Sequence, residues 1–183
     1  MSLSIGTTGY YRICPAGDFE DMGDDSGFHI NVVANDASGN GVPNIPVTDY
    51  WLDACDGAQA LYLCAGAVTA DSMTNENGET TISDAVSGGG CITSGGVYVA
   101  IQNNQVLEAP GCTDPICLDM EIKSPDLDTN GSVTLSDYGV FGAAYGSSDG
   151  DANWNECCDF NWDGSISLTD FGYFGGHYQH VCQ

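Results

Sequence analysis

The feature that most constrains the fold of this chain is an internal repeat in its last third. Residues 126–145 align with residues 159–178 without a gap, at an offset of 33 residues, and nine aligned positions are identical. Most of the other aligned pairs are conservative. Chance is a poor explanation for such a match, so we expect two copies of one small structural unit.

The oxygen-bearing side chains of each copy have the spacing of a calcium loop. Ca²⁺ binds about six to eight hard oxygen ligands, which a loop of about 12 residues supplies from positions 1, 3, 5, 7, 9 and 12, with Gly at position 6. Gly131 and Gly164 occupy that position in loops 126–137 and 159–170. We predict two bound Ca²⁺ ions, one held by Asp126, Asp128, Asn130, Ser132, Thr134 and Asp137, and the other by Asp159, Asn161, Asp163, Ser165, Ser167 and Asp170.

The residues that flank the two loops predict their immediate structure. No helical pattern precedes either loop, so we expect only the exiting helices, at residues 136–145 and 169–178. Each helix carries a Phe four residues after the last ligand, which suits a small shared core. The β-branched residues at position 8, Val133 and Ile166, predict that the two loops pair with each other as a short strand.

A duplicated calcium loop with one exiting helix, and with Asp rather than Glu at position 12, resembles the type I dockerin domains. The resemblance covers residues 126–178. It implies a small α-helical domain with two calcium loops, which docks onto a cohesin-like receptor and so attaches proteins to a scaffold. The calcium in such an extracellular module is expected to be structural.

The first two thirds of the chain are predicted to be β. Short alternating segments are separated by Gly- and Asn-rich turns, which is typical of an antiparallel sandwich. Residues 30–47 and 74–82 resemble bacterial immunoglobulin-like surface domains. We therefore expect a mainly β chain, with an immunoglobulin-like β-sandwich at residues 1–123 and the dockerin-like domain at residues 124–183, divided at Ser124-Pro125.

The charge of the chain excludes several classes of partner. Arg12 and Lys123 are the only basic residues against 26 acidic ones, which gives a formal net charge of −24. Such a chain cannot neutralise nucleic-acid phosphates or an anionic membrane surface. No apolar stretch is long enough for a transmembrane helix, and the first residues lack the features of a signal peptide. The charge opposes compaction unless cations offset it.

Nine cysteines without CxxC pairs predict a disulfide framework rather than a zinc ribbon. Disulfides place the protein in an oxidising compartment, secreted or at the cell surface. The sequence does not give the connectivity or the fate of the odd cysteine. The repeat suggests one bond, from Cys157 or Cys158 to Cys182, which would clamp the second calcium unit, while the other member of the adjacent pair reaches the sandwich.

No residue pattern indicates catalysis. The histidines, His29, His177 and His180, lack metal-binding spacing, so we expect them to be packed or exposed. Carboxylate pairs for glycoside hydrolysis stay open, as a third and less favoured interpretation. Four aromatic residues offer a platform for sugar rings or, more often in alternating strands, core packing: Tyr50, Trp51, Tyr62 and Tyr98.

We therefore expect a non-catalytic, extracellular, calcium-binding structural protein, a surface or filament subunit that acts through protein–protein contacts. Exposed strand edges, or an N-terminal segment before residue 28 exchanged between copies, would provide self-assembly. The alternative is a docking module, in which the C-terminal domain binds a cohesin-like receptor and the sandwich binds carbohydrate. The sequence does not identify the partner, the oligomeric state or the calcium affinity.

Overall fold

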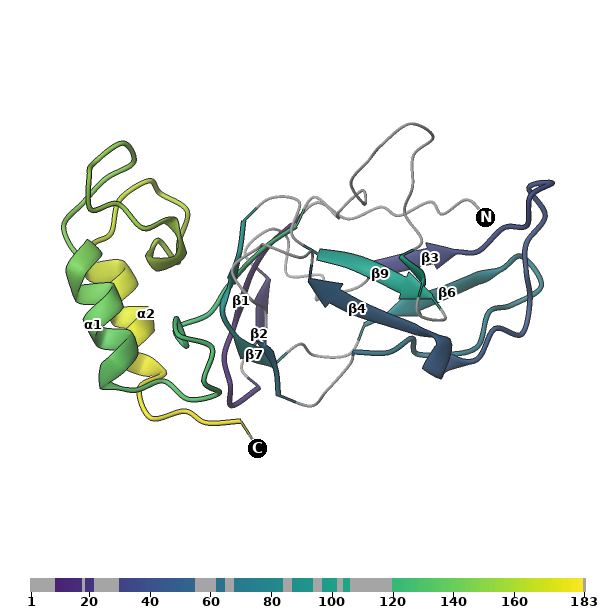
Figure 1. Ribbon diagram of the computed structural model, residues 1–183, viewed down its shortest axis with the longest axis horizontal. Helices are drawn as coiled ribbons and strands as arrows, with labels where there is room; N and C mark the ends of the chain where they lie inside the picture. The colour runs from purple at the N-terminus through teal and green to yellow at the C-terminus, as the bar shows by residue number, and fades with distance from the viewer. Residues whose placement is uncertain are drawn as a thin grey trace.

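The computed structural model places a group of small β-sheets at one end of the molecule and a pair of helices at the other (Figure 1). The structure describes residues 9–17, 19–21, 30–54, 62–64, 68–83, 87–93, 97–101, 104–105 and 120–182. His29 lies outside these ranges. In these ranges the chain is mainly β, as predicted; a short 3-10 helix, η1 (Val47–Asp49), precedes β4, and both α-helices lie in the C-terminal third.

Four sheets are present in the described ranges, and all of their strand pairs except one are antiparallel. The largest sheet has the order β2 (Phe19–Asp21), β1 (Gly9–Ile13), β11 (Met120–Lys123), β8 (Cys91–Ile92). A three-stranded sheet has the order β10 (Asn104–Gln105), β9 (Val97–Ile101), β4 (Tyr50–Ala54). The two-stranded sheets join β3 (Ile30–Val33) to β6 (Glu79–Ile82), and β5 (Tyr62–Leu63) to β7 (Gly88–Gly89).

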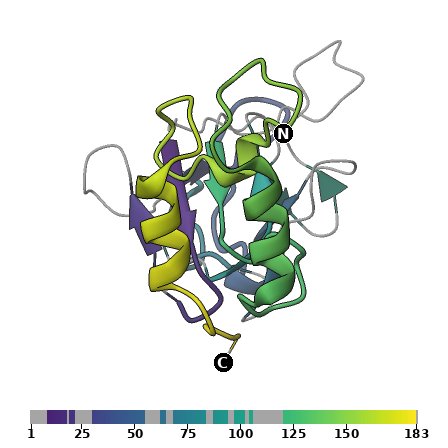
Figure 2. The same ribbon diagram turned by 90° about the vertical axis from the view of Figure 1, so that its left-hand side faces the viewer.

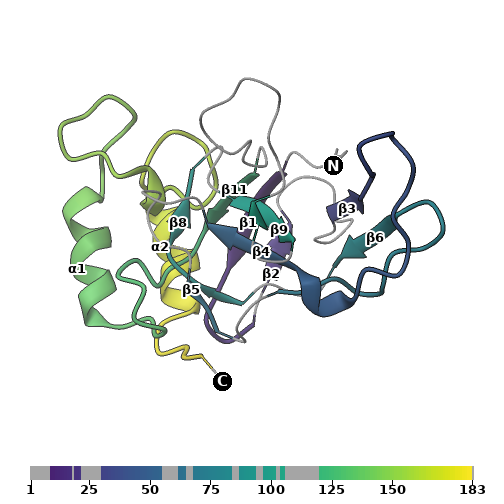
Figure 3. The same cartoon turned by 45° about the vertical axis from the view of Figure 1, so that its right-hand side comes forward.

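One hydrophobic core lies between three of these sheets. Alternate residues of β3 and β6 point inward, with Ile30 paired to Ile82, because side chains alternate between the faces of a strand. Tyr50 and Val99 from the three-stranded sheet and Ile122 from the largest sheet belong to the same buried cluster. Figure 3 shows these sheets gathered at one end of the molecule. Tyr50 is fully buried, so it packs in the core and offers no sugar platform; the side chains of Trp51, Tyr62 and Tyr98 lie outside what the structure describes.

The first described strand corrects two predictions, one about strand direction in the sheets and one about strand exchange between copies. Strand β1 pairs in parallel with β11 of the same chain, from Gly9 opposite Met120 to Arg12 opposite Lys123. The sheets are therefore not purely antiparallel. This part of the N-terminal segment also completes its own sheet, so the expectation of an exchanged strand is wrong for residues 9–13, whose hydrogen bonds are already made within the molecule.

The two helices pack on each other through the phenylalanines that the repeat predicted. Helix α1 (Leu135–Ala144) and helix α2 (Leu168–Gly176) each follow a loop, and they lie side by side in Figure 2. The rings of Phe141 and Phe174 stack with centroids 5.3 Å apart, and both are buried. The predicted exiting helices and shared core are therefore confirmed. Strand β11 precedes the first loop and a short 3-10 helix, η2 (Glu156–Cys158), precedes the second.

Two disulfide bonds connect the helix-pair region to the sheet region. Disulfides join Cys64 to Cys182 and Cys91 to Cys157. The predicted bond from Cys157 or Cys158 to Cys182 is therefore wrong, although Cys157 does reach the sheet region. The physical reason is that the C-terminal tail runs back to the sheets and away from η2. Ser124 and Pro125, at the predicted boundary, are buried. Within the described ranges, neither helix has the length or apolarity to cross a lipid bilayer.

Candidate metal centre

The first loop gathers three carboxylates around one point. Carboxylate oxygens of Asp126, Asp128 and Asp137 all lie within 4.8 Å of one another. Asp126 and Asp137 are fully buried, whereas Asp128 is exposed. Clustering buried like charges is unfavourable unless a cation or a proton compensates them. The predicted ligands at positions 1, 3 and 12 are therefore brought together by the fold.

Backbone amides hold the two buried carboxylates in place. Asp126 accepts hydrogen bonds from the amides of Asn130 (3.2 Å) and Gly131 (2.9 Å), which curl the loop around its first residue. Asp137 accepts from the amides of Leu127 (2.8 Å) and Thr134 (2.8 Å), and so ties the start of the loop to its end. Gly131 has a φ of 84°, in the left-handed region that glycine adopts without strain.

The second loop repeats this network bond for bond. Asp159 accepts from the amides of Asp163 (3.2 Å) and Gly164 (3.0 Å), as Asp126 does one repeat earlier. Asp170 accepts from the amides of Phe160 (2.8 Å) and Ser167 (2.9 Å). Even the backbone at position 4 is shared, since Thr129 and Trp162 have φ values of 60° and 56°. The sequence repeat is therefore a repeat of three-dimensional structure.

The remaining predicted ligands make local turns and caps. Asn130 and Asp163 each accept from the amide and the hydroxyl of the serine two residues later, Ser132 and Ser165. Asn161 donates from its side chain to Asp163 and accepts from the Asp163 amide. Thr134 and Ser167 are the N-caps of α1 and α2, and form capping boxes with the last aspartate of each loop. Each position-12 aspartate therefore closes its loop and starts its helix.

The predicted pairing between the two loops is wrong. Val133 pairs with the C-terminal tail, donating to the carbonyl of His180 and accepting from the amide of Gln179 (both 2.9 Å). Ile166 pairs with the segment after α1, through Gly146 and Ser147 (both 2.9 Å). Each loop thus joins the segment that follows the other helix, at equivalent positions of the repeat. The position-8 residues are buried in this arrangement, as β-branched residues in a strand prefer.

Strand β7 and the residue after it contact Asp126 of the first loop, and the sequence did not predict this contact. A Cβ atom on Gly89 would overlap the side chain of Asp126, so only glycine fits there. The amide of Gly90 donates to the carbonyl of Asp126 (2.7 Å), and the hydroxyl of Ser124 donates to the carbonyl of Gly88 (2.9 Å). Residues 88–90 are three consecutive glycines, and nothing local in the sequence reveals which carboxylate they face.

Lys123 makes the two loops electrostatically different. Its ammonium group is buried, donates to the carbonyl of Asp159 (2.7 Å) and lies 4.3 Å from the ring centroid of Trp162. Burial lowers the pKa of Lys123 and raises that of Asp159, and the attraction between the two charges opposes both shifts. For Asp126, burial raises the pKa to about 6, the hydrogen bond from Gly131 opposes this, and the neighbouring Asp137 charge raises it further.

The raised pKa of Asp126 predicts an unusual pH dependence when calcium is chelated. A carboxyl group whose folded pKa exceeds its ordinary value of 3.8 binds a proton more tightly in the folded state. Its contribution to the free energy of unfolding is therefore fully present below that value and is lost as the pH rises through about 6. Urea melts of the calcium-free protein in calcium-free buffer at pH 5 and pH 7 should show this contribution as a difference between the wild type and Asp126→Asn. Equal pH dependence in both proteins would contradict it.

The donor set of both loops fits calcium. Carboxylate, amide, hydroxyl and carbonyl oxygens are the hard ligands that Ca²⁺ prefers, and soft sulfur or imidazole ligands are not part of either predicted set. The buried carboxylates of the first loop lie close together, and the negative charges of Asp137 and Asp128 both raise the pKa of Asp126, after the larger effect of burial. A divalent cation held there by these three residues would offset most of their negative charge, while the amides fix their positions.

Comparisons with known proteins add little to this geometry. No protein-family model matches the chain, and no curated protein matches its sequence. Two solved structures align over almost the whole chain, an N-terminal and a C-terminal interface mutant of a type II cohesin–X-dockerin complex from Acetivibrio cellulolyticus. The alignments cover 99% and 96% of this chain and 97% of each of theirs, at 17% and 19% identity and TM-scores of 0.34 and 0.33. Similarity at this level establishes neither a shared fold nor a shared partner.

Proposed function

We propose that this chain is a non-catalytic, extracellular or cell-surface calcium-binding module, whose helix pair binds a partner protein. Two Ca²⁺ ions would stabilise the loops from which the helices emerge. The immunoglobulin-like sandwich would carry the docking unit on a rigid base, to which two disulfides attach it. The observation that carries this proposal is an exposed apolar face on the helix pair.

The exposed face is built from equivalent positions of the two repeats. Leu135 and Leu168, the first residues of α1 and α2, are 72% and 74% exposed. A groove between the helices is lined by Leu135, Tyr138, Phe171, Phe174, Gly175 and Tyr178. A second groove, between the segment after α1 and the start of α2, is lined in part by Tyr145 and Leu168. Single exposed leucines need no explanation, but apolar residues gathered on one face indicate an interaction surface.

Charge favours a different protein over a second copy of this one as the occupant. Residues 124–183 contain nine acidic side chains and neither Lys nor Arg, and the whole chain carries a formal charge of −24. Two copies would repel each other even with both calcium sites filled, because two Ca²⁺ ions supply only four positive charges. A partner with an apolar patch bordered by Lys or Arg would be attracted instead. We therefore propose that the partner is a cohesin-like receptor whose apolar patch is bordered by Lys or Arg.

Binding to purified type I and type II cohesin domains tests this proposal. Biolayer interferometry in calcium should show binding, which EGTA abolishes. The double variant Leu135→Asp/Leu168→Asp should weaken it by roughly 30-fold or more, since the loss of one central apolar anchor costs about 2 kcal/mol or more. Both leucines are changed together because each repeat could substitute for the other. Met73→Asp, at a 59% exposed residue outside the helix pair, is the matched control.

The same samples distinguish the receptor from self-assembly. Sedimentation velocity should show monomers in both calcium and EGTA. Calcium-dependent dimers or filaments, lost in the leucine double variant, would mean that this face binds a second copy, as a surface or filament subunit would. Monomers that bind no cohesin domain would overturn the cohesin-like receptor. Binding to insoluble polysaccharide that the leucine variants leave intact would place a carbohydrate site on the sandwich.

A further inference from the structure

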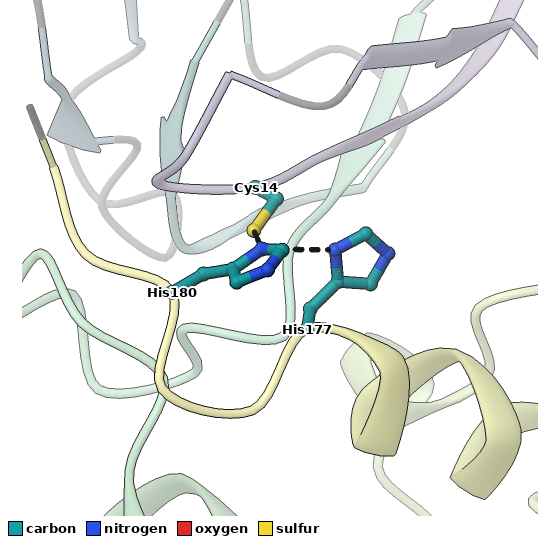
Figure 4. Close-up of side chains that lie close together, drawn as sticks. All are labelled: Cys14, His177 and His180. Carbon is teal, nitrogen blue, oxygen red and sulfur yellow. Dashed lines mark hydrogen bonds between the residues drawn. The ribbon is translucent and has the colours of Figure 1, made fainter.

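Three side chains that the sequence gave no reason to connect meet where the C-terminal tail crosses the end of β1. The sulfur of Cys14 lies 3.1 Å from Nδ1 of His180, and Nδ1 of His177 lies 3.4 Å from the same atom (Figure 4). One potential ligand atom from each residue lies within 4.8 Å of the others. Cys14 is buried, and the two histidines are half-buried. Cys14 and His180 are 166 residues apart in the chain.

We propose that Cys14, His177 and His180 form a binding site for a transition-metal ion of the Zn²⁺ class, separate from the calcium loops. Thiolate and imidazole are ligands that Zn²⁺ prefers and Ca²⁺ does not. In tetrahedral zinc sites, with bonds of about 2.0–2.1 Å to nitrogen and about 2.3 Å to sulfur, neighbouring ligands are roughly 3.3 Å (N–N) and 3.6 Å (S–N) apart. The two separations that involve His180 are close to these values, the third pair lies within 4.8 Å, and a small rotation of Cys14 would lengthen its contact with His180.

The repeat shows that the fold does not require histidine at either position. Residue 144, at the end of α1, and residue 147 are equivalent to 177 and 180, and in both copies the amide of the later residue donates to the carbonyl of the earlier one (3.1 and 3.0 Å). They are Ala144 and Ser147, both buried, and the hydroxyl of Ser147 donates to the carbonyl of Ala144 (2.6 Å). Histidine therefore replaces small residues in the copy of the repeat that faces Cys14. Metal ligation explains both replacements at once.

The surrounding structure holds the three ligands in place. The backbone of His180 is fixed by Val133, and Cys182, two residues later, is held by Gly131 (2.9 Å) and by its disulfide to Cys64. His177 is the C-cap of α2, and its ring lies 4.4 Å from that of Tyr173. Metal sites bind tightly when their ligands are oriented before the metal arrives.

The test uses the full chain, purified with its disulfides intact and saturated with Ca²⁺ so that the loops do not take up the probe. Isothermal titration with Zn²⁺ should show one ion bound per chain. Titration with Co²⁺ should give a thiolate-to-metal charge-transfer band and the intense visible bands of tetrahedral coordination. Zn²⁺ should also raise the melting temperature, because it binds only the folded arrangement.

Two of the test variants, His177→Ala and His180→Ser, introduce the residues that the first repeat carries at the equivalent positions, so they are expected to fold. Cys14→Ser, His177→Ala and His180→Ser should each weaken Zn²⁺ binding by about 100-fold or more, since a metal ligand matters at least as much as its supporting contacts. His29→Ala, at the third histidine, should leave it unchanged. A Co²⁺ spectrum without the thiolate band, or unchanged Zn²⁺ affinity in Cys14→Ser, would overturn the proposal, as would a wild type that binds no Zn²⁺. These results are independent of partner binding by the helix pair.

Discussion

Chelating calcium should lower the melting temperature of this chain by about 10–20 °C. A ligand present at about 100 times its dissociation constant stabilises the folded state by roughly 2.7 kcal/mol per site, so two sites contribute about 5 kcal/mol. For a domain of this size, each kcal/mol shifts the melting temperature by about 2–4 °C. The effect should be large because Asp126, Asp137, Asp159 and Asp170 are almost fully buried carboxylates. Calorimetry in Ca²⁺, in Mg²⁺ and in EGTA measures it.

Single-site variants assign the calcium effect to the loops. Asp126→Asn and Asp159→Asn should each remove about half of the difference between Ca²⁺ and EGTA, and the double variant should remove all of it. Asp149→Asn, at an exposed aspartate outside both loops, is the matched control. Gly89→Ala should behave like Asp126→Asn, because its added Cβ would displace that carboxylate and leave the second loop alone. A melting temperature that does not change in EGTA would contradict the calcium assignment.

Removing either described disulfide should destabilise the chain by about 3–5 kcal/mol. The bonds close sequence separations of 118 residues for Cys64–Cys182 and 66 residues for Cys91–Cys157. Cross-links of this span restrict the unfolded chain strongly, and chain-entropy arguments give about 4–5 kcal/mol for loops near 100 residues. Replacing both cysteines of a pair by serine, and measuring unfolding in urea with calcium present, gives the loss for each bond.

The two disulfides should also differ in which calcium loop they support. Cys182 donates from its amide to Gly131 (2.9 Å), so opening Cys64–Cys182 releases the tail that pairs with the first loop. Cys157 lies in η2, directly before the second loop. In an Asp159→Asn background, which leaves only the first site, the Cys64→Ser/Cys182→Ser change should weaken Ca²⁺ binding by about tenfold, the cost of roughly one or two hydrogen bonds.

The same disulfide variants, measured when only the second calcium site is left intact, provide the control. In an Asp126→Asn background, which leaves only the second site, the Cys91→Ser/Cys157→Ser change should weaken Ca²⁺ binding, and the Cys64→Ser/Cys182→Ser change should have little effect. Equal losses at both sites from either disulfide would mean that the bonds act only through global stability. The contacts between the tail and the first loop would then not control calcium affinity.

The sequence alone determined the local structure of the C-terminal third. Ligand spacing, the turn glycines Gly131 and Gly164, and the capping residues Thr134 and Ser167 all lie within one loop or one turn of the residues they contact. Local hydrogen bonds therefore follow from local order. The core pair Phe141 and Phe174 could be predicted because the repeat guarantees that both copies present the same face. The mainly β character of the first two thirds followed from alternation and turn residues in the same way.

Only the tertiary structure decided which distant segments meet. The parallel pairing of β1 with β11, the disulfide partner of Cys182 and the seating of Asp126 against Gly89 each join residues tens of positions apart or more. No pattern in a single sequence encodes such contacts, because many pairings satisfy the same local preferences. The pairing of the first loop with the segment after α2 brings His180 to Cys14. The ligand spacing of the two loops is thus a property of the sequence, whereas the Cys14–His177–His180 cluster forms only because the C-terminal tail returns to the end of β1.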